Sequence, residues 1–211
     1  TIWPEVADHI MPEQSWLTLA SHCFNAHKDA TTLICFTDED WVTKTIQQYN
    51  GKEGPHGFYN FKVIKQTVFF PDLPDAFDGF QITQISDVHS GSFDNKEKIE
   101  YAIDLVNQQN SDMILFTGDI VNTHAKEMHP WLDTFNHIKT HKYGKYAVLG
   151  NHDYGEYVTW PSNKEKNDNF LAIKNLYHQI GFQLLLNEHT FIEKEADKIA
   201  LVGVENWGEK F

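Results

Sequence analysis

The stretch QITQISDVHSG (residues 81–91) decides the fold of this chain. A strand-like run, Phe80–Ser86, leads directly into Asp87 and His89, which are two residues apart. The later stretch SDMILFTGD repeats this arrangement, because an apolar run again ends in a polar donor, Asp119. In open α/β sheets, ligands bind beyond the carboxyl ends of the strands. Both stretches therefore predict a strand that delivers metal-type donors to one edge of a sheet.

A third block of the same kind follows at the same interval. An apolar run ends at Leu149, and Gly150 then precedes Asn151, His152 and Asp153. The first donor of each block lies 32 positions after that of the block before it. Equal spacing predicts three strands joined by two crossovers of equal length. We therefore expect the three sets of donors to meet on one rim of the sheet.

The strands and helices expected after residue 57 alternate. Strand, helix, strand, helix and strand in succession is typical of a doubly wound parallel sheet. Capping boxes indicate helix starts at Asp94–Glu97 and at Ser162–Glu165. The expected strands are Tyr59–Phe70, Phe80–Ser86, Met113–Phe116, Lys145–Leu149, Phe182–Leu186, His189–Glu193 and Ile199–Val204, and the expected helices are Lys96–Asn110, Pro130–Lys139 and Asn169–Ile180.

The first 57 residues read differently from the rest. A length of 211 residues fits one domain with an appended piece. The linker GKEGPHG predicts a boundary, with residues 1–57 as an N-terminal α/β segment of unknown role and 58–211 as the main domain. Within the first segment we expect helices at Pro12–Ala26 and Thr37–Tyr49 and a strand at Ala30–Phe36.

Composition narrows the function classes. The formal net charge of −13 argues against a broad nucleic-acid-binding surface. The sequence shows no signal peptide and no apolar run near the roughly 20 residues that span a bilayer. The compartment stays open between the cytoplasm and a membrane surface. Cys23 and Cys35 are expected to be two buried thiols or a single disulfide.

The donor types point to a metal centre. A carboxylate and an imidazole two residues apart on an extended segment, as in Asp87 and His89, can point to the same side. Mixed Asp and His ligation suits Zn, Mn or Fe. The two oxygens of Asp119 can bridge a pair of cations, and the Asn151 amide oxygen can bind the second without adding charge. Such a pair would clamp a phosphoryl group and activate a water.

Two neighbouring residues complete the predicted chemistry. His152 follows a predicted ligand and is therefore expected close to the leaving oxygen of a phosphoester. Asp153 is expected to orient the imidazole of His152, as carboxylates orient catalytic histidines. The aromatic residues Tyr154, Tyr157 and Trp160 either line a substrate pocket or pack the segment that follows, and the sequence favours neither.

Taken in order, the motifs DVH, GDIVN and GNHD resemble the conserved blocks of calcineurin-like metallophosphoesterases. The resemblance spans about Tyr59–Phe211, and the runs FKV, DVHSGSFDN and GVENWG are similar to its bacterial membrane-associated branch. It implies a four-layer α-β-β-α sandwich that holds two divalent ions and hydrolyses phosphoesters with a metal-bound hydroxide. By this resemblance Asp87 and His89 hold the first ion, Asp119 bridges, Asn151 holds the second and His152 contacts the phosphate.

The chain departs from the family pattern in three places. Asn122 stands where Asp is usual, so we expect it to face the substrate or to support a ligand. The family continues with a histidine at a strand end and a G-H-x-H block, neither of which occurs before Phe211. We therefore expect a C-terminally incomplete chain. Residues 1–57 are polar, whereas the branch carries membrane helices before its catalytic domain.

Two function hypotheses follow. The first is a metal-dependent hydrolase acting on phosphodiesters, phosphomonoesters or lipid-linked pyrophosphates, with peripheral membrane association left open. The alternative is a catalytically inactive, truncated member of the family that acts as a binding or structural module. Metal content and hydrolysis of a generic aryl phosphodiester separate the two.

Overall fold

A computed structural model describes residues 30–35, 59, 61 and 63–206. Its centre is a six-stranded sheet in the order β2-β1-β3-β4-β5-β6. β2 runs antiparallel to β1, and the remaining neighbours are parallel. The strands are β1 (Ala30–Cys35), β2 (Val63–Thr67), β3 (Ile82–Ser86), β4 (Met113–Phe116), β5 (Lys145–Ala147) and β6 (Gln183–Leu184).

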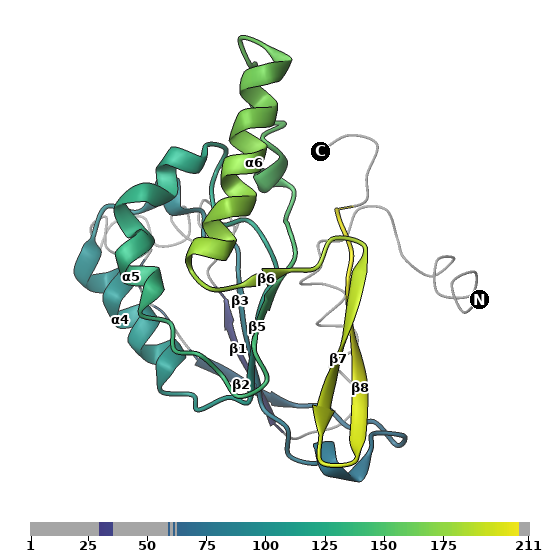
Figure 1. Cartoon of the computed structure of the whole chain (residues 1–211). Helices are drawn as coiled ribbons and strands as arrows, with labels where there is room; N and C mark the ends of the chain where they lie inside the picture. Colours follow the sequence, from purple (N-terminus) through teal and green to yellow (C-terminus); the bar gives the residue numbers. More distant parts are fainter. Residues whose placement is uncertain (1–29, 36–58, 60, 62, 207–211) are drawn as a thin grey trace, which may run out of the picture.

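The two faces of this sheet are covered differently (Figure 1). The helices α4 (Lys96–Asn107), α5 (Leu132–Asn136) and α6 (Asn163–Gln179) lie on one side. A second, two-stranded sheet of β7 (Glu188–Lys194) and β8 (Asp197–Gly203) lies on the other. The described residues thus form an α, a β and a second β layer, a mixed α/β arrangement with a parallel sheet that agrees with the predicted fold class.

β4 shows why both faces must be covered. Side chains alternate along a strand, so Ile114 and Phe116 join the core cluster under the helices. Met113 and Leu115 point the other way, into a smaller cluster with Phe77 of the short helix η2 (Asp75–Phe77) and with Ile192 of β7. Burial of each large apolar side chain contributes about 1.5–3 kcal/mol. The unbroken apolar run of β4 therefore matches its position at the centre of the sheet.

Helix ends differ from the predicted ones for local reasons. α4 begins after Asn95, whose side chain accepts a hydrogen bond from the Lys98 N–H at 3.1 Å, so the cap is not Asp94. α6 begins six residues earlier than expected, behind the predicted cap Ser162. The first turns of α6 are polar and exposed, so apolar spacing gave no sign of them. The helix predicted over Pro130–Lys139 is divided between the 3-10 helix η4 (Ala125–Trp131) and α5.

β1 brings part of the N-terminal segment into the sheet. The strand predicted over Ala30–Phe36 is confirmed at Ala30–Cys35, while Phe36 lies outside the described residues, and the strand pairs with both β2 and β3. The helices expected at Pro12–Ala26 and Thr37–Tyr49, and the boundary at residue 57, lie outside the described residues. The boundary therefore stays a prediction.

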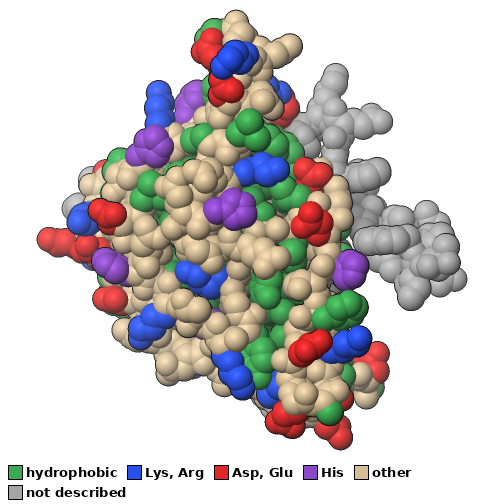
Figure 2. Space-filling view, viewed as in Figure 1, with side chains coloured by type: hydrophobic (Ala, Val, Ile, Leu, Met, Phe, Trp, Pro, Cys, Tyr) green, Lys and Arg blue, Asp and Glu red, His purple; other side chains and the backbone are tan. Residues whose placement is uncertain are grey.

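The described surface carries lysine side chains scattered among acidic ones in the view of Figure 2. The same view shows a strip of hydrophobic side chains beside the two-stranded sheet of β7 and β8. Among the helices of the described residues, none combines the length and the apolar character needed to cross a bilayer.

Candidate metal centre

Two loops meet beyond the carboxyl ends of β3 and β4. The Asp87 N–H donates to the Gly118 carbonyl at 3.1 Å, and the His89 N–H donates to the Asp119 carbonyl at 2.9 Å. The next residue continues the pattern, because the Ser90 N–H donates to the Ile120 carbonyl at 3.1 Å. Main-chain hydrogen bonds therefore fix the position of the first donor block against the second.

The third block joins them through two glycines. A Cβ atom on Gly118 would overlap the Gly150 nitrogen, and a Cβ on Gly150 would overlap the Asp119 carboxylate. Gly118 also has φ +102°, a conformation that side chains rarely adopt. Only glycine at both positions lets the second and third loops touch main chain to main chain. The convergence of three distant blocks on one rim is therefore a feature of the fold.

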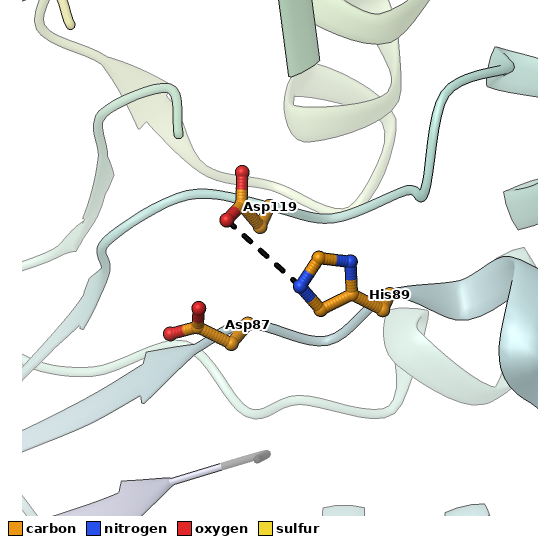
Figure 3. Close-up of side chains that lie close together, drawn as sticks. All are labelled: Asp87, His89 and Asp119. Atoms are coloured by element: carbon orange, nitrogen blue, oxygen red, sulfur yellow. Dashed lines mark ion pairs between the residues drawn. The ribbon is translucent and has the colours of Figure 1, made fainter. Parts of the chain in front are cut away.

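Asp87, His89 and Asp119 form a cluster that could hold a cation. Each offers one ligand atom, and these atoms lie within 4.8 Å of one another. Figure 3 shows the His89 ring facing the Asp119 carboxylate, with Nε2 and Oδ2 3.9 Å apart. That separation is too long for a hydrogen bond, but two ligands of one transition-metal ion lie about 3–4 Å apart. Two carboxylates and an imidazole thus fit Zn, Mn or Fe.

All three of these residues have an unusual main-chain conformation. The φ angles are +53° at Asp87, +45° at His89 and +58° at Asp119. Among the described residues only six that are not glycine have positive φ, and half of them belong to this cluster. The left-handed conformation costs such residues about 1–3 kcal/mol each, and it persists where surrounding contacts enforce it. The main-chain hydrogen bonds described above supply that enforcement.

Asp153 holds the loops together and is fully buried. Its Oδ2 accepts from the Asp119 N–H at 2.9 Å, the Gly150 N–H at 3.1 Å and the Tyr177 hydroxyl at 2.8 Å. Its Oδ1 accepts from the Ile120 N–H at 3.0 Å. Burial raises the pKa of Asp153 to about 6, although the four hydrogen bonds oppose this shift.

The role predicted for Asp153 is therefore corrected. The sequence indicated that this carboxylate orients the His152 imidazole, because the two residues are adjacent. The structure directs both of its oxygens to the main chain of the other donor loops and to Tyr177. A carboxylate that accepts several main-chain N–H groups fixes their geometry. Asp153 thus joins the second and third blocks.

His152 lies beside the cluster and is held on several sides. Its N–H donates to Asp119 Oδ1 at 2.9 Å. Its Nδ1 lies 2.7 Å from the Asn122 carbonyl oxygen, so Nδ1 carries the proton in this contact. Its ring meets the His89 ring edge to face, with centroids 4.5 Å apart. The Asn122 carbonyl therefore does the orienting that was predicted for Asp153.

Asn122 sits next to His152 through its main chain. Its side-chain amide donates to Ser92 Oγ at 2.9 Å, and its N–H donates to Glu127 Oε2 at 2.7 Å. The Glu127 carboxylate also accepts from the next two main-chain N–H groups, those of Thr123 and His124. Sequence reasoning missed Glu127. Its position three residues after the cap of η4 was the available signal.

Asn151 and the aromatic residues after it form the outer part of the site. The Asn151 side-chain amide donates to the Tyr157 hydroxyl. The Tyr157 ring stacks on the His152 ring, with centroids 4.4 Å apart and 19° between the planes. Tyr154 instead stacks on Phe170. Of the three aromatic residues left open by the sequence, Tyr157 contacts the donor residues, and it remains 47% exposed.

Comparisons with known proteins identify the family that this chain resembles. The family model described as calcineurin-like phosphoesterase matches residues 80–207. A Danio rerio protein named "Transmembrane protein with metallophosphoesterase domain" is 24% identical over 150 residues, covering 69% of this chain and 31% of that protein. Two Bacillus subtilis proteins also match.

The first of these, the "Uncharacterized metallophosphoesterase YkuE", is 36% identical over 92 residues, covering 41% of this chain and 31% of the relative. The second, the "Uncharacterized metallophosphoesterase YkoQ", is 27% identical over 153 residues, covering 70% and 52%. The matched part of the chain thus spans between 31% and 52% of the length of these three relatives.

Proposed function

Because the chain belongs to the calcineurin-like phosphoesterase family, we propose that it is a metal-dependent hydrolase of phosphoester bonds. The observation that carries the proposal is the cluster of Asp87, His89 and Asp119 with His152 directly beside it. Residues 58–211 would supply the catalytic side chains, and the part of residues 1–57 outside β1 would be appended to this domain.

The proposed cofactor is a pair of divalent ions of Mn, Fe or Zn. Asp87 and His89 would hold the first, Asp119 would contact both, and Asn151 would hold the second through its amide oxygen. Bound there, the ions would act as Lewis acids toward the phosphoryl oxygens and would lower the pKa of a water.

His152 would handle the proton of the leaving group. Its Nδ1–H is directed to the Asn122 carbonyl, so its Nε2 is the nitrogen available to substrate. In the protonated imidazole this Nε2–H would donate to a phosphoryl oxygen or to the departing alkoxide. The Asn122 carbonyl and the Tyr157 ring would keep the imidazole aimed while that proton moves. Asn122 would face the substrate next to them.

The proposal covers three classes of substrate. A dimetal site of this kind fits phosphodiesters, phosphomonoesters and lipid-linked pyrophosphates, because each presents a phosphoryl group with a leaving oxygen. The Danio rerio relative is named as a transmembrane protein, which supports including peripheral membrane association in the proposal.

The test begins with metal content. The Mn-loaded chain is expected to carry two ions by elemental analysis and to hydrolyse bis(4-nitrophenyl) phosphate or 4-nitrophenyl phosphate. Asp119→Ala should lose metal and activity together. His152→Ala should retain metal and lose about 100-fold or more of kcat. The exposed His129 provides the matched control, and His129→Ala should leave both quantities unchanged.

Each outcome separates the two hypotheses drawn from the sequence. Unchanged hydrolysis in both Asp119→Ala and His152→Ala would refute the proposed site. If the wild-type chain is folded but binds no Mn²⁺ and releases no nitrophenol, the alternative is favoured, namely a binding or structural module without catalysis.

A further inference from the structure

Tyr157 contacts two residues of the proposed site at once. Its hydroxyl accepts a hydrogen bond from the Asn151 side-chain amide, and its ring stacks on the His152 imidazole. With 47% of its surface exposed, it is not part of the hydrophobic core. A tyrosine that packs little and yet contacts a proposed ligand and a proposed acid has a position that core packing does not explain.

We propose that Tyr157 is a positioning residue that sets the orientation of the Asn151 amide and of the His152 imidazole. This inference rests on the proposed function, since it assigns Asn151 to a cation. The hydroxyl and the ring act separately, so the two roles can be tested with different substitutions.

The hydroxyl acts on the amide. An asparagine side chain binds a cation through Oδ1 alone, and a rotation of 180° would present its NH₂ group to the ion instead. In the structure Nδ2 donates to the Tyr157 hydroxyl, so Oδ1 points away from that contact. Partners of this kind commonly orient metal ligands, and their loss costs about 10–100-fold in metal affinity.

The ring acts on the imidazole. His152 has the His89 ring against it on one side and the Tyr157 ring stacked on it at 4.4 Å. With Nδ1 bonded to the Asn122 carbonyl, these contacts leave the imidazole little freedom to rotate. A flat aromatic side chain at position 157 is therefore sufficient for this second role, and the hydroxyl is not required for it.

The segment that carries Tyr157 is attached to the rest of the fold at both ends. The Trp160 indole N–H donates to the Gly155 carbonyl at 2.7 Å, and its ring meets the His124 ring edge to face. Glu156 pairs with Lys166 of α6. These contacts hold residues 155–160 in place beside the donor loop, as positioning requires.

The experiment measures Mn²⁺ affinity by electron paramagnetic resonance titration of the full chain, without substrate. Tyr157→Phe should weaken the more weakly held ion about 10-fold and leave the other unchanged. The same substitution in an Asn151→Asp background should have no such effect, because either oxygen of a carboxylate can bind the cation.

A second measurement, of kcat with substrate, tests the ring. Tyr157→Leu should weaken Mn²⁺ binding to the same extent as Tyr157→Phe, and its kcat should be about 10-fold below that of Tyr157→Phe.

Tyr101 of α4 is the matched control, because it is 52% exposed and lies outside the site. Tyr101→Phe should change neither affinity nor kcat. Unchanged affinity in Tyr157→Phe, or an equal loss in the Asn151→Asp background, would overturn the role of the hydroxyl. Equal kcat in the Phe and Leu variants would overturn the role of the ring. A wild-type chain that binds no Mn²⁺ would instead refute the proposed function itself.

Discussion

The inner and outer halves of the candidate site are built in different ways. The inner half, with Asp87, His89 and Asp119, is held by main-chain hydrogen bonds between loops and by the buried carboxylate of Asp153. In the outer half, the Asn151 amide is held by the side chain of Tyr157, which is 47% exposed. The inner half therefore depends on the fold as a whole, whereas single substitutions can change the outer half without unfolding the chain.

This contrast indicates where variation is tolerated. Loss of an inner contact leaves buried main-chain groups without partners, and each such group costs about 1–3 kcal/mol. Loss of an outer contact exposes groups that water can satisfy. We expect substitutions in the inner half to lower stability and substitutions in the outer half to alter metal binding or turnover at nearly constant stability.

The largest effect is expected at the contact between the second and third loops. In Gly150→Ala the new methyl group would overlap the Asp119 carboxylate, so the loops must separate. The free energy of unfolding in urea should fall by about 3 kcal/mol or more. Gly79→Ala is the control, because Gly79 has φ +69° but open space around it, and about 1–2 kcal/mol is expected there. Equal losses of unfolding free energy in the two variants would show that the close approach of the loops contributes no additional stability.

A smaller effect is expected from the buried carboxylate. Asp153→Asn keeps one acceptor oxygen, but it removes the charge and turns an NH₂ group toward main-chain donors. Urea unfolding should show a loss of about 2–3 kcal/mol. Tyr177→Phe removes only the hydroxyl donor to the same carboxylate and should cost about 1 kcal/mol. A variant Asp153→Asn as stable as wild type would contradict the assignment of Asp153 to loop joining.

The smallest effect is expected where the segment that carries Tyr157, in the outer half, is attached to α6. Lys166→Gln breaks the partly exposed ion pair with Glu156, and such pairs contribute about 1 kcal/mol or less. Thermal unfolding should therefore change little, and the small difference should shrink in high salt. A loss as large as that of Asp153→Asn would break the contrast between the two halves.

The sequence predicted the inner half well, because its signals are local. Apolar runs that end in Asp87 and Asp119 defined the strand ends, and parallel strands bring such ends to one edge. The structure places these donors together as expected. Met113–Phe116 matched β4 to the residue, since burial on both faces leaves an unbroken apolar run.

The outer half was harder to predict for physical reasons. Tyr157 belongs to an irregular segment with no hydrophobic periodicity, so nothing in the sequence indicated which way its ring points. Asp153 was given the wrong partner because adjacency in sequence suggested His152, whereas its actual partners lie in the second donor loop and in α6, more than 20 positions away, or across a tight turn. Contacts of this kind depend on tertiary structure and leave no local pattern.

The left-handed main chain at residues 87, 89 and 119 has a consequence for sequence design. A redesign method that optimises folding energy alone would choose glycine at all three positions, because glycine adopts that conformation without strain. The resulting chain would be free of main-chain strain at these positions, but it would lose every ligand of the cluster and the Asp119 carboxylate that accepts the His152 N–H. For this protein, the strain at residues 87, 89 and 119 thus accompanies the activity proposed for it.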